Sequence, residues 1–250
     1  WGCMDHSACN YNSEANMDDG SCEYHSGGWY VSIDGNNTNC GSEEYPLSDI
    51  QYAINNSNNG DTILVSAGTY YENIDFNGKD IALIGESKEA SIIDGGGSLP
   101  VVKVVSGESV LIKNLTLQNG YNTTNGGAVR NWQSDVVLEN LIVINNNASE
   151  GGAIFGDNSN SIEDHYSYYI KNCLFYNNIS RGTNGGATLH FTGYSNDIIL
   201  ENLTVYNNIA NNSPVGGLFM WWNTNIEIIN CIFWDNSPSS LGLMGNNGNM

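Results

Sequence analysis

The sequence predicts an all-β protein, a parallel β-helix in which short strands stack in successive coils. A motif of Asn followed by three residues recurs at intervals of 26 to 32 residues, beginning at Asn114, Asn140, Asn172, Asn202 and Asn230. A run rich in β-branched residues precedes each Asn, and a Gly-Gly pair separates neighbouring copies. No helical periodicity lies between the copies, so the repeating unit consists of strands and turns.

Within each copy, the residues one and three positions after the Asn share one face of a strand. They are apolar throughout and form the predicted core: Leu115, Leu117, Leu141, Val143, Cys173, Phe175, Leu203, Val205, Cys231 and Phe233. The Asn itself is expected at a sharp bend. Asn tolerates left-handed backbone there and can bond its own copy in the next coil.

Cys173 and Cys231 occupy equivalent inward positions two coils apart. Stacked strands lie about 4.8 Å apart, so the two Cα atoms are expected roughly 9.6 Å apart. A disulfide requires less than about 7 Å. We therefore predict that both thiols are free, buried and inert.

Residues 1–28 form a predicted module of their own. They hold Cys3, Cys9 and Cys22 among acidic and Asn side chains, and they cannot bury a core. Such Cys-dense segments are held together by disulfides in oxidising compartments. The segment resembles a short Cys- and Asp-rich repeat of large secreted proteins of marine bacteria. That resemblance implies a Cys3–Cys22 bond and leaves Cys9 for Cys40, although four cysteines allow three connectivities.

The Asp-Asp-Gly turn of this module also resembles the calcium loops of thrombospondin type 3 repeats, which implies calcium as a cofactor. Calcium takes six to eight oxygen ligands from carboxylates and carbonyls. The candidate ligands are Asp5, Asn10, Asn12, Asp18, Asp19 and Glu23. The alternative is an acidic turn held by a disulfide, without a metal.

Residues 29–250 form the predicted β-helix, which begins with a short helix near residues 47–56. The apolar residues of this helix lie on one face: Leu47, Ile50, Ala53 and Ile54. Ser48 is the predicted N-cap. The end of a solenoid exposes its core and unpaired backbone, so an amphipathic helix is expected to close it.

This region resembles the right-handed parallel β-helix domains of the pectin-lyase-like superfamily. The matching segments are Tyr30 to Gly35, Gly60 to Val65, Gly68 to Tyr70 and Gly78 to Gly85. Further on, Gly151 to Ile154 and Phe175 to Asn178 resemble repeats of polymorphic surface proteins and adhesins. We therefore expect a right-handed, single-stranded solenoid of about seven coils. The resemblance implies no single function, since the fold hosts lyases, hydrolases, epimerases and adhesins.

Composition limits the function. The formal net charge is −20 with only seven Lys and Arg residues, which argues against nucleic acids and anionic membranes as partners. No apolar run is long enough to span a membrane. The chain begins at Trp1 without a visible signal peptide, so we interpret it as a processed part of a longer multidomain protein, secreted or displayed on a cell surface.

Catalytic motifs of polygalacturonases and pectate lyases are absent from the sequence. Lys113 and Lys171 directly precede the repeating Asn and are interpreted as solvent-facing. The remaining catalytic candidates are Asp164 and His165, in the longest insertion, and His190 one coil later. An insertion folded over the strand face would bring these three together. The alternative, an acidic surface loop with an incidental histidine, is favoured.

Aromatic residues follow the Gly-Gly pairs. Four of them are predicted to form an exposed stripe along the solenoid: Trp132, Phe155, Phe191 and Trp222. This phase places Val129 inward and Arg130 outward. The opposite phase buries Phe155 but also Arg130, and an unpaired buried charge is costly, so the exposed stripe is the prediction. Exposed aromatic side chains on a flat face stack on sugar rings or dock a neighbouring domain.

The function favoured by the sequence is extracellular recognition, by a non-catalytic, adhesin-like domain that binds a glycan or matrix polymer through this stripe. The alternative is a divergent polysaccharide lyase or glycoside hydrolase, which needs basic groups or carboxylates that converge in a groove. A third interpretation is a passive spacer that holds other domains away from the cell.

Overall fold

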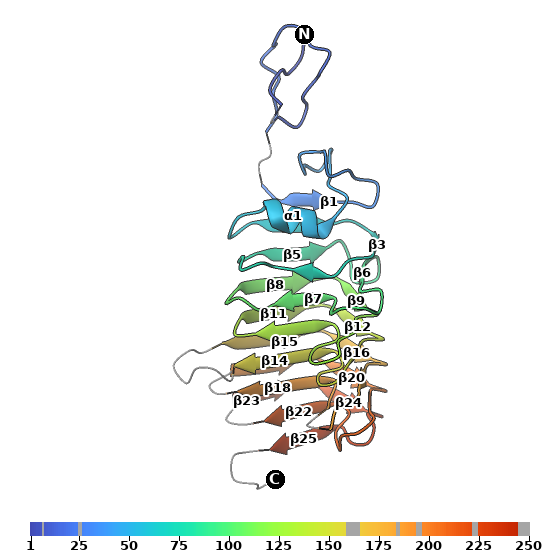
Figure 1. The fold of residues 1–250 in the computed structure, drawn as a ribbon. Helices are drawn as coiled ribbons and strands as arrows, with labels where there is room; N and C mark the ends of the chain where they lie inside the picture. The colour runs from blue at the N-terminus through green and yellow to red at the C-terminus, as the bar shows by residue number, and fades with distance from the viewer. Residues whose placement is uncertain are drawn as a thin grey trace.

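The computed structural model describes residues 1–6, 8–24, 27–158, 166–183, 186–193, 197–221 and 225–244. They form an elongated stack of parallel strands, with the N-terminal module at one end (Figure 1). Neighbouring strands within a sheet come from successive coils and pair in parallel. The predicted parallel β-helix is confirmed, and connections between parallel strands are right-handed as a rule.

Three long sheets form the sides of the stack. The eight-stranded sheet, called the β11 sheet below, contains β1 (Trp29–Val31), β2 (Thr62–Val65), β5 (Ala82–Gly85), β8 (Ser109–Lys113), β11 (Asp135–Glu139), β15 (Ser167–Lys171), β19 (Asp197–Glu201) and β23 (Asn225–Ile229). The β10 sheet contains β4 (Ile74–Asp75), β7 (Val102–Val104), β10 (Val129–Trp132), β14 (Ile154–Asn158), β18 (Leu189–Gly193), β22 (Leu218–Trp221) and β25 (Leu241–Met244).

The third side, the β12 sheet, contains β3 (Gly68–Tyr70), β6 (Ser91–Asp94), β9 (Thr116–Gln118), β12 (Ile142–Ile144), β16 (Leu174–Tyr176), β20 (Thr204–Tyr206) and β24 (Ile232–Trp234). A small sheet of β13 (Asn147–Ala148), β17 (Ile179–Ser180) and β21 (Ile209–Ala210) lies between the β12 and β10 sheets along the chain. The expectation of about seven coils differs slightly from these counts, since the largest of the sheets described here has eight strands.

The repeating Asn residues form the bends between the β11 and β12 sheets. Their backbone is left-handed, with φ between 52° and 57°: Asn114, Asn140, Asn172, Asn202 and Asn230. Asn140 Nδ2 donates to Asn114 Oδ1 at 2.8 Å, and Asn202 Nδ2 donates to Asn172 Oδ1 at 3.1 Å. Both expectations for this residue, the bend and the bond to its copy, are confirmed.

The predicted core residues that follow these bends are buried, except in the last coil. Cys173 and Cys231 are free, as predicted, and burial raises the pKa of the Cys173 thiol to about 12, which leaves it inert. Cys231 and Phe233 are only partly buried, so the prediction that Cys231 is buried is wrong. Cys231 follows β23 and Phe233 lies on β24, the end strand of its sheet, where no described coil covers them.

A second set of asparagines forms a buried row inside the solenoid: Asn146, Asn178, Asn208 and Asn236. Asn178 Nδ2 donates to Asn208 Oδ1 at 3.0 Å and to Val143 O at 2.9 Å. Its Oδ1 accepts from Asn146 N and Nδ2, both at 3.0 Å. The Asn178 amide is therefore saturated by the coils above and below it.

The predicted capping helix is present as α1 (Ile50–Asn56), and Ile50, Ala53 and Ile54 are buried against the first coils. Ser48 is not its cap. The Glu72 carboxylate accepts hydrogen bonds from Ile50 N and Gln51 N, each at 2.8 Å, and so satisfies the first two N–H groups of the helix from another segment. Among the described residues, no helix is long and apolar enough to cross a membrane.

The N-terminal module is joined to the solenoid covalently. Cys3 pairs with Cys22 and Cys9 pairs with Cys40, so both predicted disulfides are confirmed. Figure 1 places the module beyond α1, at the end of the stack opposite β25.

Candidate binding surfaces

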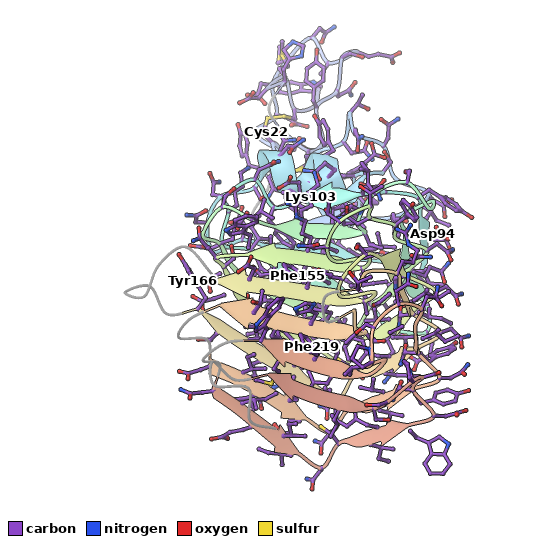
Figure 2. All side chains as sticks on the ribbon, turned by 60° about the horizontal axis from the view of Figure 1, so that its bottom comes forward. Cys22, Asp94, Lys103, Phe155, Tyr166 and Phe219 are labelled. Carbon is purple, nitrogen blue, oxygen red and sulfur yellow. A yellow bond between two sulfur atoms is a disulfide. The ribbon has the colours of Figure 1, made fainter. Side chains whose placement is uncertain are left out.

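The outer face of the β10 sheet carries two rows of outward side chains. Strand register places Arg130 beside Lys103 and Phe155, and Trp132 beside Asp157. The first row therefore reads Asp75, Lys103, Arg130, Phe155, His190 and Phe219. The second row, called the tryptophan row below, reads Trp132, Asp157, Thr192 and Trp221. Figure 2 shows Lys103, Phe155 and Phe219 along one side of the stack.

The predicted exposed stripe is wrong at two of its four positions. Phe191 is completely buried, since it shares an inward position with Asn131, and its ring lies 5.2 Å from that of Tyr168. Phe155 does point outward, but only 3% of its surface is exposed. Trp222 lies outside the described residues, and Trp132 is half-buried on the outer face.

The prediction fails because the number of residues between the Gly-Gly pair and the first inward residue of the strand changes from coil to coil. The first inward residue of the strand follows the Gly-Gly pair by two positions at Val129 and Ile154, by three at Leu189 and by one at Leu218. Trp221 therefore takes the outward position of the tryptophan row, with 37% of its surface exposed. Sequence reasoning missed Trp221 because it assumed a constant offset.

Next to the tryptophan row, the side chains of Phe155, His190 and Phe219 occupy outward positions of their strands but are buried, and their rings pack together. His190 lies 5.1 Å, ring centre to ring centre, from both Phe155 and Phe219, and 1% of it is exposed. Burial lowers the pKa of His190 to about 3, so the imidazole is neutral. Its Nδ1 lies 3.9 Å from a carboxylate oxygen of Glu150. Burial, and then the nearby charge of Asp157, raise the pKa of Glu150.

The burial of His190 argues against a catalytic role for the predicted group of Asp164, His165 and His190. Asp164 and His165 lie outside the described residues, and the remaining member, His190, has almost no surface that a polymer could contact. The cationic side chains of the face lie nearer its N-terminal end. There Lys103 Nζ lies 3.6 Å from Asp75 Oδ2, and Arg130 occupies the next coil.

The predicted calcium ligands are used in separate turns. Asn12, Asp18 and Asp19 each accept a hydrogen bond from the backbone N–H two residues later. Asn10 Oδ1 accepts from Glu23 N at 2.8 Å, and Asp5 Oδ2 accepts from the Tyr24 hydroxyl at 2.8 Å. The described residues contain no group of three or more His, Cys, Asp or Glu placed to hold a metal ion. Calcium binding stays a prediction.

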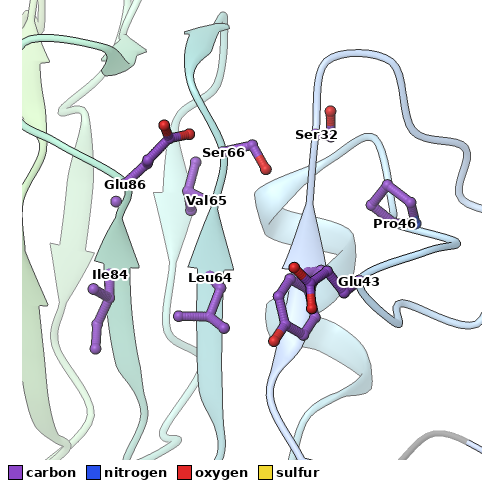
Figure 3. Close-up of a pocket in the computed structure, with 10 residues that line it drawn as sticks. Ser32, Glu43, Pro46, Leu64, Val65, Ser66, Ile84 and Glu86 are labelled. Carbon is purple, nitrogen blue, oxygen red and sulfur yellow. The ribbon is translucent and has the colours of Figure 1, made fainter.

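The outer face of the β11 sheet carries three shallow hollows. One, about 390 Å³, lies over β1, β2 and β5 and is lined by Leu64, Ile84 and Glu43, among others (Figure 3). The second lies over β5, β8 and β11 and is lined by Leu111 and Val137, among others. The third lies over β19 and β23 and is lined by Ile199.

No protein-family model and no curated protein matches the chain. Among solved structures, it is similar to a pectin methylesterase from carrot, with 13% sequence identity, a TM-score of 0.46, and 92% of this chain and 86% of that chain covered. It is also similar to pectin methylesterase PemA from Erwinia chrysanthemi (13% identity, TM-score 0.40, 90% and 91% covered). A pectin methylesterase in complex with hexasaccharide VII gives 12% identity and a TM-score of 0.39, with 90% and 91% covered.

These likenesses concern the fold alone. The strand order and register of the chain itself confirm the parallel β-helix. Identities of 12–13% and TM-scores below one half carry nothing about activity.

Proposed function

We propose that the chain is an extracellular recognition domain that binds a glycan or matrix polymer along the outer face of the β10 sheet, without catalysis. The observation that carries this proposal is the tryptophan row, in which Trp132 and Trp221 flank Asp157 and Thr192 on four neighbouring strands. The two disulfides support an oxidising, extracellular setting.

The geometry of the row suits a chain of sugar rings. Trp132 and Trp221 lie three coils apart, roughly 14 Å at the spacing of stacked strands. Each indole offers an apolar face for a ring, and the oxygens of Asp157 and Thr192 lie between them for hydroxyl groups. Lys103 and Arg130, in the adjacent row, are placed for anionic substituents.

The alternative of a polysaccharide lyase or hydrolase has less support. Such an enzyme needs an acid or base that contacts the polymer, and His190 is covered on both sides by Phe155 and Phe219. The passive-spacer interpretation gives no reason for two tryptophans in one outward row.

A glycan-array screen, followed by titration of the best ligand, tests the proposal. Trp132→Ala and Trp221→Ala are each expected to weaken binding by about 1–3 kcal/mol while leaving the melting temperature nearly unchanged. Tyr71→Ala, which removes an aromatic side chain that is 78% exposed between β3 and β4, is the matched control and should bind as the wild type does.

An absorbance assay for unsaturated uronate products belongs beside the screen. Turnover of a uronate polymer, or retention of full affinity by both tryptophan variants, contradicts a non-catalytic binding face at the β10 sheet.

A further inference from the structure

The outer face of the β11 sheet carries a row of side chains whose charges alternate in sign from one coil to the next. Strands β8, β11, β15 and β19 pair residue by residue, over five positions between β8 and β11 and between β15 and β19, and over four between β11 and β15. The last position of each strand points outward and alternates in sign, a set called the charged row below: Lys113, Glu139, Lys171 and Glu201. Glu139 bridges Lys113 Nζ at 3.0 Å and Lys171 Nζ at 3.3 Å.

An alternating row of four charges is complementary to itself when it is reversed. A two-fold axis that lies parallel to the strands, between β11 and β15, would reverse the order of the coils and keep the position along each strand. Lys113 would then face Glu201 of a second copy, and Glu139 would face Lys171. We propose that the β11 sheet is the interface of a two-fold symmetric homodimer of this chain.

The middle outward row agrees with this symmetry. It is apolar and half-buried in all four strands: Leu111, Val137, Tyr169 and Ile199. The same axis places Leu111 against Ile199 and Tyr169 against Val137. Val137 and Leu111 line one of the hollows on this face, so Tyr169, whose hydroxyl donates to Glu201 of its own chain, lies opposite the margin of a recess in the partner. Such a contact would remove apolar surface from water on both copies.

The first outward row agrees as well. It alternates Ser and Asp, in the order Ser109, Asp135, Ser167 and Asp197. Under the two-fold axis, each Asp faces a Ser: Asp135 meets Ser167, and Asp197 meets Ser109. None of the three rows brings like charges together across the proposed interface. In an isologous interface the same surface must complement itself, and this face does so at all three rows.

The charge of the whole chain makes this face distinctive. With a net charge of −20, two copies repel each other in most orientations. The charged row contains two of only seven basic residues and has no net charge, so association through it avoids that repulsion. The six strands from β5 to β23 span about 24 Å by 13 Å, which is small for an interface. The dimer is therefore expected to be weak, with a dissociation constant of the order of 10–100 µM.

Sedimentation equilibrium of the full chain over a wide concentration range, combined with charge reversal, tests the dimer. The wild type is expected to associate to a dimer and no further. Lys113→Glu places like charges across the interface, as does Glu201→Lys, and each is expected to raise the dissociation constant at least about ten-fold. The double variant Lys113→Glu/Glu201→Lys restores opposite charges and should recover most of the wild-type association.

Lys88→Glu is the matched control, since it makes the same change of charge in the β5–β6 connection, outside this face, and it should dimerise as the wild type does. Circular dichroism confirms that each variant is folded. A wild type that stays monomeric at several hundred micromolar, single reversals without effect, or a double variant that fails to recover overturns the proposal. The assay contains no glycan and reads a different face, so its outcome is independent of the proposed binding function.

Discussion

Asparagine occupies two kinds of position in each coil, and the two are held by different forces. At Asn114, Asn140 and their copies, the residue relieves the strain of left-handed backbone and lies at a bend. At Asn146, Asn178 and their copies, it is buried and its amide links three coils. Only the first kind was predicted from the sequence, because the bend recurs with a visible period. The buried kind recurs with the same period, directly after another bend residue, but this period does not show that its side chain points into the core.

The buried row makes a testable contribution to stability. Asn178→Ala is expected to lower the free energy of unfolding by about 2–4 kcal/mol, because it removes the donor to Val143 O and the acceptor of Asn146 N in the core, and leaves Asn146 Nδ2 only its bonds to Leu117 O and Ile144 O. Urea denaturation measures this loss. Asn212→Ala, at an exposed asparagine with one bond to Arg181 O, is the control and should cost less than about 1 kcal/mol. Equal losses in the two variants would show that the buried row adds nothing.

The buried imidazole of His190 should make stability depend on pH. Its pKa is about 3 in the folded protein and about 6.5 when unfolded, so stability is fully present above 6.5 and is lost as the pH falls toward 3. Between pH 7.5 and 5.0 the unfolded state gains a proton that the folded state cannot take, which costs about 2 kcal/mol. His190→Phe removes this term, while Glu150 and the other carboxylates stay in both proteins. Urea denaturation at the two pH values should show the smaller loss in the variant, and an equal loss would contradict the burial of a neutral imidazole.

At the scale of single elements, α1 closes the N-terminal end of the solenoid through Glu72. Its two N–H contacts predict that Glu72→Ala destabilises the protein by about 1–2 kcal/mol. Ser48→Ala is the matched control, since the Ser48 hydroxyl bonds only the side chain of Asp49. Thermal unfolding of both variants decides between the two caps, and a larger loss in the Ser48 variant would restore the cap expected from the sequence.

The strands show where sequence reasoning succeeds and where it stops. In the β11 and β12 sheets the phase is fixed by the recurring Asn, and every core residue that follows it was assigned to the correct face. In the β10 sheet the connections vary in length, so Leu189 and Leu218 enter their strands at different offsets from the Gly-Gly pair. A shift of one residue exchanges the faces, which is why Phe191 was placed outside and Trp221 was overlooked. The burial of Phe155 and His190 at outward strand positions depends on tertiary packing, and no periodic pattern in the sequence indicates it.

At the scale of the whole molecule, the N-terminal module is attached by the chain and by the Cys9–Cys40 bond. None of its residues belongs to the continuous apolar core of the solenoid, which begins at Val31. Replacing Cys9 and Cys40 by Ser is therefore expected to shift the melting temperature of the solenoid by less than about 3 °C. The same change should make the module easier to release by limited proteolysis. A large drop in melting temperature would show that the module supports the fold.

The two ends of the stack differ, and this gives unfolding a direction. One end is closed by α1, whereas core-facing side chains of the last described coil meet solvent, with Ile228 43% and Leu241 50% exposed. The stability of a solenoid is approximately a sum over coils and their contacts with neighbours, so the coil with the fewest contacts opens first. Amide hydrogens should accordingly exchange fastest in β23 and β24 and slowest around β8 and β11, in a gradient along the axis. Unfolding by heat or denaturant is then expected to begin at the coil that contains β23 and β24 and to proceed, one coil after another, toward the end that α1 covers.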